Sequence, residues 1–155
     1  MTNDLSVEHP SDLEITLSRA VDAPRDLVFA AHTQAEHLKH WWGRGNPLDV
    51  EIDFRVGGRY RYVEHTPDGE SHAFRGEFRE IVPNERIVQT FEYEPMAGHI
   101  LEETVVFEER GGQTVVTSTS RFANKEDRDG MVASGMEDGA AESYAVLDSY
   151  LKTLA

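Results

Sequence analysis

The sequence of residues 136–154 constrains the fold more than any other stretch of the chain. If this stretch is helical, its apolar side chains fall within an arc of about 80° and its charged side chains face the other way. The apolar stripe consists of Met136, Ala140, Tyr144, Leu147, Leu151 and Leu154. The opposite side carries Glu137, Asp138, Glu142, Asp148 and Lys152. A helix of this length spans roughly 28 Å and needs an apolar surface to pack against.

The preceding sequence supplies that surface as strands. Seven segments alternate apolar and polar residues, which is typical of strands with one buried face. We place these strands at about 13–21, 48–56, 59–65, 71–82, 87–93, 100–109 and 113–121. Short turns join the last six into a meander, so the first strand must add to its edge. Two short helices, 24–32 and 34–40, separate the first two strands, and a third, 124–134, precedes the long helix. The pattern predicts an α+β fold in which a seven-stranded curved antiparallel sheet wraps around the C-terminal helix.

The length of 155 residues favours one domain. Residues 1–11 are polar and lack the pattern of a secretory signal, so we expect a flexible tail there and a single domain over 12–155. The absence of cysteine excludes disulfides, thiolate catalysis and cysteine-ligated metals. We therefore expect a cytoplasmic protein.

The formal net charge of −14 makes this an acidic protein. Such a charge repels phosphate backbones and anionic lipid surfaces, so we expect neither nucleic acid nor a membrane as a partner. The same acidity also has a simpler interpretation, which is solubility.

Five local patterns occur in a recognisable order. They are the segment 23–29 beginning with Ala-Pro, Trp41-Trp42-Gly43, the hairpin segment 56–60, the segment 76–91 from Gly-Glu-Phe to Thr-Phe, and Ser134-Gly135-Met136 followed by Gly139. Together they resemble the helix-grip fold of the START and Bet v superfamily, also called SRPBCC. Within it, the chain is similar to the activator of heat-shock protein 90 ATPase homologue-like family. The resemblance covers about residues 13–154 and implies a cavity between the sheet and the long helix.

Many large side chains fall at positions that would line such a cavity. The candidate ligand-binding residues are Trp41, Trp42, Phe54, Tyr60, Tyr62, Phe74, Phe78, Phe91, Tyr93, Phe107, Met131, Met136 and Tyr144. The alternative is that each of them simply fills the core. Tyrosines on an inner face suit a cavity wall, because they combine an apolar ring with a hydroxyl group that needs a partner.

Candidates for chemistry are few. Glu64 is in phase with Tyr60 and Tyr62, and His72 is in phase with Phe74, so both are weak catalytic candidates; the alternative is a position at the rim of the sheet. The histidines at 32, 37 and 40 lack the spacing of a metal-binding helix, and no phosphate loop or dinucleotide fingerprint is present. We expect no metal and no cofactor.

Three functions remain open. The first is a soluble protein that encloses a small hydrophobic or amphipathic ligand between the sheet and the helix. The second is an enzyme of the same fold, either similar to polyketide cyclases and aromatases or hydrolytic. The third is a chaperone-associated protein-interaction module, and either a homodimer or another protein partner is compatible with the sequence.

Overall fold

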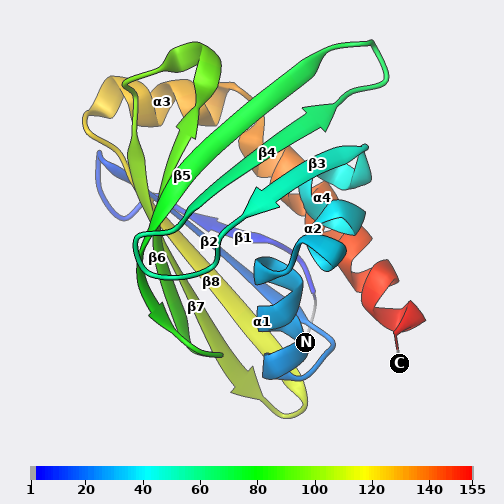
Figure 1. Ribbon diagram of the computed structural model, residues 1–155. Coiled ribbons are helices and arrows are strands. Elements are labelled where there is room, and N and C mark those ends of the chain that lie inside the picture. Colours follow the sequence, from blue (N-terminus) through cyan, green and yellow to red (C-terminus); the bar gives the residue numbers. More distant parts are fainter. Residues whose placement is uncertain (1–2, 155) are drawn as a thin grey trace.

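One curved antiparallel sheet forms the wall of the molecule, and helices cover its inner face (Figure 1). The computed structural model describes residues 3–154. The strands are β1 (Ser6–Glu8), β2 (Glu14–Val21), β3 (Leu48–Ile52), β4 (Arg59–His65), β5 (Ser71–Val82), β6 (Arg86–Tyr93), β7 (Leu101–Arg110) and β8 (Gln113–Arg121). The helices are α1 (Arg25–Thr33), α2 (Ala35–Trp41), α3 (Lys125–Ala133) and α4 (Met136–Thr153), with short 3-10 turns η1 (Trp42–Gly45) and η2 (Glu94–Met96).

The strand order, β1-β2-β8-β7-β6-β5-β4-β3, confirms the predicted meander. Strand β2, which precedes α1 and α2 in the sequence, pairs with β8 at the edge of the meander, as predicted. The sheet has eight strands and not seven, because β1 pairs with β2, with Val7 opposite Leu17. This edge strand lies in the segment expected to be a tail. Its three residues are exposed and too few to show an alternating pattern.

Strand β3 ends earlier than predicted. The Asp53 amide donates a hydrogen bond to the Arg59 carbonyl (2.9 Å), and the Gly58 amide donates to Arg55 (2.8 Å), so the chain turns before Phe54. A Cβ atom at Gly58 would lie 2.0 Å from the Asp53 carbonyl oxygen, which explains the glycine. Val56, in the same turn, is 60% exposed and does not contribute to the core.

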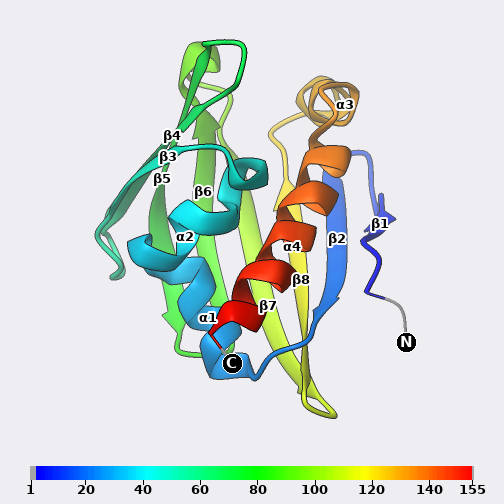
Figure 2. The same cartoon turned by 90° about the vertical axis from the view of Figure 1, so that its right-hand side faces the viewer.

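Helix α4 crosses the inner face over β8 and β2, with α2 beside it (Figure 2). Gly135, at φ 83°, ends the turn after α3 and lets α4 begin in a new direction. Leu147 and Leu151 of the predicted stripe are buried. Two expectations were wrong: Leu154 lies beyond the helix and is 45% exposed, and Asp148 faces the sheet, where it pairs with Arg19.

The turn η1 is fixed against α4. Arg44 adopts a left-handed conformation (φ 63°) between two glycines of the same hand, Gly43 and Gly45. Its amide donates a hydrogen bond to the Ser143 hydroxyl group (2.9 Å), and its guanidinium group occupies the space beside Gly139. These contacts hold the start of η1, and therefore Trp42, at the edge of the sheet.

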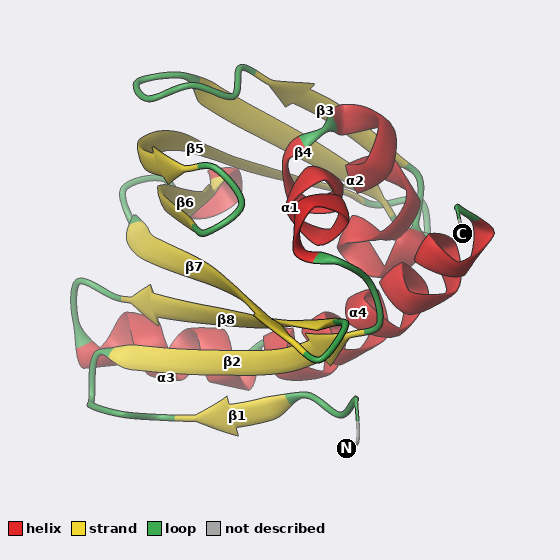
Figure 3. Ribbon diagram, turned by 90° about the horizontal axis from the view of Figure 1, so that it is seen from below, coloured by secondary structure: helices red, strands yellow, loops and turns green. Residues whose placement is uncertain are grey.

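The core has two parts. The larger part packs α1, α2 and the end of α4 against the sheet, with Val28, Leu38 and Leu147 fully buried. The smaller part joins Ile15, Leu101 and Phe122 to side chains from α3 and the start of α4. Seen from below, the sheet curves around the helices (Figure 3), which is the helix-grip arrangement predicted from the sequence.

Candidate ligand-binding site

The strand register determines which side chains face the helices. Tyr62 lies opposite Phe74, and Gln89 lies opposite Glu103, on the face that packs against α4. We call this the inner face. Its members on β4 to β8 include Tyr60, Tyr62, Glu64, His72, Phe74, Phe78, Gln89, Phe91, Tyr93, Leu101, Glu103, Val105, Phe107, Val116, Ser118 and Ser120.

Half-buried aromatic side chains form a row across this face, and we call Trp42, Phe74 and Phe91 the aromatic row. The ring centroids of Trp42 and Phe74 are 5.1 Å apart, and those of Phe74 and Phe91 are 5.4 Å apart. Phe91, Met131 of α3 and Met136 of α4 all pack against the smaller part of the core. All five side chains are only half-buried, so solvent reaches this part of the inner face.

Tyr93, Tyr144 and Phe54 are the other half-buried members of the predicted set. The Tyr93 ring lies 5.2 Å from that of Phe74, next to the aromatic row. Tyr144 projects from α4 onto the Trp41 ring at 5.5 Å. The structure therefore brings most of the half-buried candidates together around one region of the inner face.

The remaining predicted residues lie in closed parts of the core. Tyr60 donates its hydroxyl hydrogen to the Thr90 carbonyl oxygen, and Trp41 donates its indole N–H to the Ala31 carbonyl oxygen (3.0 Å). The other buried side chains are Tyr62, Phe78 and Phe107. Phe54 is half-buried but packs on Phe29 and Phe78, away from the aromatic row. In these positions the side chains serve as core packing.

A carboxylate occupies the middle of the inner face. Glu103 lies between Leu101 and Val105 along β7, where the alternation places an apolar residue. One of its oxygens, Oε1, accepts a hydrogen bond from Gln89 Nε2 on β6 (2.9 Å), and the other, Oε2, accepts from Ser118 Oγ on β8 (2.6 Å). We call Gln89, Glu103 and Ser118 the inner polar cluster.

Burial governs the electrostatics of this cluster. Desolvation raises the pKa of Glu103 above its ordinary value, and the hydrogen bonds from Ser118 and Gln89 oppose part of that shift. The negative charge of Glu103 adds to the effect of burial in raising the pKa values of Tyr60, Tyr62 and Tyr144. All three hydroxyl groups are protonated at neutral pH, and those of Tyr60 and Tyr144 donate their hydrogens to groups of the protein.

His32 of α1 lies under Tyr144. Its Nδ1 atom is 2.8 Å from the Val28 carbonyl oxygen, which only accepts, so Nδ1 carries the proton. Its Nε2 atom then accepts a hydrogen bond from the Tyr144 hydroxyl group (3.3 Å). Burial lowers the pKa of His32 to about 4, so the ring is neutral and fixes the direction of the Tyr144 hydroxyl group.

Glu64 and His72, the two catalytic candidates, lie opposite each other on β4 and β5. They line a hollow of about 490 Å³ between η1 and the β4–β5 hairpin. Glu64 accepts a hydrogen bond from Asn46 (2.8 Å), and His72 contacts the Tyr93 hydroxyl group (2.8 Å) and the Glu70 carboxylate (3.3 Å). Both residues lie at the rim of the sheet, and no serine or threonine hydroxyl group is hydrogen-bonded to either side chain among residues 3–154.

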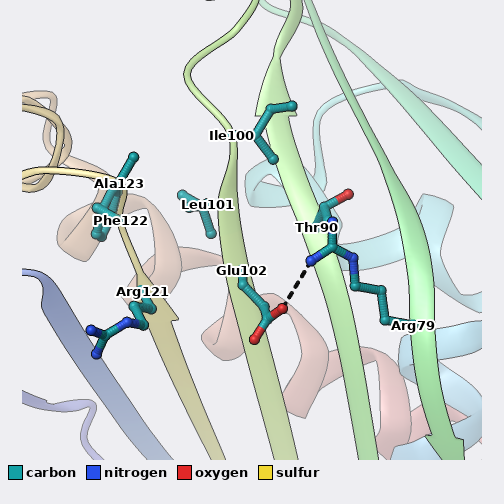
Figure 4. Close-up of a pocket in the computed structure, with 8 residues that line it drawn as sticks. All are labelled: Arg79, Thr90, Ile100, Leu101, Glu102, Arg121, Phe122 and Ala123. Carbon is teal, nitrogen blue, oxygen red and sulfur yellow. Dashed lines mark hydrogen bonds and ion pairs between the residues drawn. The ribbon is translucent and has the colours of Figure 1, made fainter.

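A second hollow, of about 410 Å³, lies beside the start of β7 (Figure 4). Glu102 and Arg79 form an ion pair at its edge (3.1 Å), and Thr90, Leu101 and Phe122 contribute to its lining. It is open and contains no member of the aromatic row or the inner polar cluster. We therefore do not assign it to ligand binding.

Within the described part of the chain, no group of three or more histidine, aspartate or glutamate side chains is arranged to hold a metal ion. His37 instead contacts the Tyr150 hydroxyl group (2.6 Å), and His40 stacks on the Tyr150 ring. None of the helices in residues 3–154 has both the length and the apolar character needed to cross a membrane.

Comparison with known families gives a match over most of the chain. The model for the Activator of Hsp90 ATPase homolog 1-like protein family matches residues 22–152. The chain belongs to this family. No curated protein matches the sequence.

Several solved structures share the whole fold of this family member. A protein from Rhodobacter sphaeroides is 25% identical, with a TM-score of 0.88 over 98% of this chain and 100% of its own. A protein from Arthrobacter aurescens is 26% identical, with a TM-score of 0.86 over 96% of this chain and 91% of its own. Ms6760 from Mycobacterium smegmatis, at 23% identity and a TM-score of 0.85 over 95% of this chain and 96% of its own, shares the fold.

The sequence analysis of this family member missed the inner polar cluster. Its signal was present, because Glu103 is in phase with Leu101, Val105 and Phe107, and Gln89 is in phase with Phe91. A polar residue at an apolar position of a strand marks a buried polar group that needs partners. The two ionisable residues predicted on β4 and β5, Glu64 and His72, lie at the rim of the sheet.

Proposed function

We propose that the chain binds a small amphipathic molecule on the inner face, between the sheet and the start of α4. The binding site consists of the aromatic row, which contacts the apolar part of the ligand, and the inner polar cluster, which contacts its polar group. We call this combination the inner-face site. The observation that carries the proposal is Glu103, a hydrogen-bonded carboxylate beside half-buried aromatic side chains.

The composition of the site supports this proposal. Ligand sites are mostly apolar and contain a few well-placed polar groups that orient the ligand. Trp42, Phe74 and Phe91 are half-buried, although such large aromatic side chains bury much area when a core closes over them. A ligand that covers these rings would remove their remaining apolar surface from water, which favours binding.

Native mass spectrometry of the purified protein, beside a denatured control, tests the proposal. We expect a bound mass that is released on denaturation, or stabilisation by members of a panel of fatty acids, sterols and aromatic polyketides. Phe91→Ala should weaken binding by about tenfold, which corresponds to about 1.4 kcal/mol. The matched control is Val106→Ala, because Val106 is also half-buried but lies on the outer face of β7.

The results that count against the proposal are equally specific. An apo mass together with no stabilisation by any panel member would mean that side chains alone occupy the space. Equal weakening by Phe91→Ala and Val106→Ala would mean that the loss arises from reduced stability and not from a lost ligand contact.

An enzyme of the same fold is the second candidate, and Glu103 is the observation that favours it. An acid–base catalyst must be ionisable, hydrogen-bonded and close to the substrate, and burial raises the pKa of Glu103 above its ordinary value. Turnover of a bound ligand that is lost in Glu103→Gln while binding remains would support catalysis.

A protein-interaction module receives less support. The family description names an activator of the Hsp90 ATPase. Among residues 3–154, the exposed large apolar side chains are Val7, Val56, Met96, Ile100 and Leu154. Met96 and Ile100 share the connection between β6 and β7, and the other three come from separate segments. A docking surface needs a contiguous apolar patch.

A further inference from the structure

Glu103 has no cationic partner within residues 3–154. None of the ion pairs in this part of the chain includes it, and its hydrogen-bond donors, Gln89 Nε2 and Ser118 Oγ, are neutral. Arg19, on the inner face of β2, is paired with Asp148 at 2.7 Å. The protein therefore places a carboxylate inside the fold without supplying the charge that would neutralise it.

The two neutral donors satisfy the carboxylate only in part. An ionised carboxylate accepts about four hydrogen bonds, and each oxygen of Glu103 receives one in the protein. Burying a charge is unfavourable unless a counter-charge or further hydrogen bonds accompany it. The remaining acceptor positions of Glu103 therefore favour a ligand group that donates hydrogen bonds and carries positive charge.

The aromatic surroundings favour the same kind of group. Phe91 is two residues from Gln89 on β6, and its ring faces the side of β7 that carries Glu103. Tyr60 and Tyr62 lie close enough for the charge of Glu103 to affect them. Ring faces attract cations, and the effect is stronger where water is excluded. The net charge of −14 also attracts cations and repels anions over the whole surface.

We propose that the inner-face site takes an organic ammonium ion with an aromatic body, whose ammonium group pairs with Glu103 and whose ring packs on Phe74 and Phe91. This inference rests on the proposed function and specifies the ligand class. The ammonium group donates hydrogen bonds to the free acceptor positions of the carboxylate. Gln89 and Ser118 hold that carboxylate in place and keep their own hydrogen bonds.

Three ligands of matched shape test this inference by isothermal titration calorimetry. Tryptamine carries an ammonium group, tryptophol replaces it with a hydroxyl group, and indoleacetate replaces it with a carboxylate. We expect tryptamine to bind at least about tenfold more tightly than tryptophol, and indoleacetate to bind most weakly. This comparison uses the unmodified protein, so it does not depend on the folding of a variant.

Variants of the protein then show which residue causes the preference for the ammonium group. Glu103→Gln should weaken tryptamine binding by at least about tenfold and tryptophol binding by less, so that the difference in affinity between the two ligands disappears. Glu102→Gln is the matched control, because Glu102 directly precedes Glu103 on β7 but faces outward and pairs with Arg79. It should leave the affinities for all three ligands unchanged. Circular dichroism confirms that each variant is folded.

The outcomes separate this inference from the proposed function. Equal binding of tryptamine and tryptophol, or a preference for indoleacetate, would overturn the ammonium assignment. So would tryptamine binding that Glu103→Gln does not affect, or no tryptamine binding at millimolar concentration. In each case, a cellular molecule retained in native mass spectrometry and lost in Phe91→Ala would leave the proposed function standing.

Discussion

The Nη2 atom of Arg19 on β2 lies 2.7 Å from the Oδ2 atom of Asp148 on α4. The Arg19 side chain is 7% exposed, so this ion pair is largely shielded from water. The other carboxylate oxygen, Asp148 Oδ1, is buried and has no hydrogen-bond partner in the described part of the chain. A charged connection between the sheet and the long helix therefore lies beside the inner face, and its geometry leaves one acceptor unsatisfied.

The first prediction concerns this pair. Asp148→Ala leaves the Arg19 guanidinium group buried without a counter-charge, so the free energy of unfolding should fall by about 3–5 kcal/mol in urea titrations. Glu142→Ala is the control, because Glu142 pairs with Arg44 at the surface of the same helix (3.8 Å) and should cost less than about 1 kcal/mol. Replacing both partners, in Arg19→Met with Asp148→Leu, should recover most of the loss. Equal losses in the single and double variants would contradict this account.

The second prediction concerns Gly76, which lies opposite Tyr60. A Cβ atom at Gly76 would lie 2.0 Å from the Thr90 carbonyl oxygen and 2.5 Å from the Tyr60 ring. Gly76→Ala should therefore destabilise the protein by about 1–3 kcal/mol in thermal or urea unfolding, the usual range for overpacking. Gly130→Ala provides the opposite control, because a Cβ atom there meets nothing and helix α3 should gain about 0.5–1 kcal/mol. A neutral Gly76→Ala variant would show that the Tyr60 ring is free to move.

The fold could be predicted from the sequence because its signals are local and repeated. Strand alternation and the short turns between strands predicted the order of the elements and most of their boundaries. The Asn124 side chain caps α3 by accepting a hydrogen bond from the Asp127 amide (2.8 Å). These features depend on neighbouring residues, so periodicity and turn chemistry reveal them.

The candidate site was harder to predict because its polar groups depend on partners from distant parts of the chain. Helical periodicity assigns Asp148 to the polar side of α4. In the structure Asp148 pairs with Arg19 of the sheet, which is 129 positions away in sequence. The alternation of β7 places Glu103 on the inner face, but its partners Gln89 and Ser118 come from neighbouring strands and are known only from the register. Helical and strand periodicity assign faces from average hydrophobicity, so they do not detect a charge that is paired inside.

The third prediction follows from the raised pKa of Glu103. Its folded pKa lies above the unfolded value of 4.5, so the folded protein binds the proton more tightly. The resulting stability is fully present below the unfolded pKa and is lost as the pH rises through the folded pKa. Glu103→Gln removes this dependence, so the variant should gain stability relative to the unmodified protein as the pH rises from about 4 to 7 in urea titrations. A difference that stays constant with pH would refute the prediction, and Glu102→Gln again serves as the control from the outer face.

The last prediction concerns His32, whose pKa is lowered in the folded protein, whereas that of Glu103 is raised. Burial lowers its pKa from 6.5 to about 4, so the unfolded chain binds a proton that the folded protein excludes. The neutral ring therefore contributes stability that is fully present above about pH 6.5 and is lost as the pH falls towards 4, by about 3 kcal/mol at most. Proton NMR should show that the His32 ring stays neutral down to about pH 5. The His32→Gln variant should be less stable at neutral pH, because it loses the ring contacts with Trp41 and Phe107 and the hydrogen bond with Tyr144. Its stability should, however, fall less steeply on acidification. Titration of His32 near its ordinary pKa would show that water reaches the ring and that the Tyr144 hydroxyl group is not held by it.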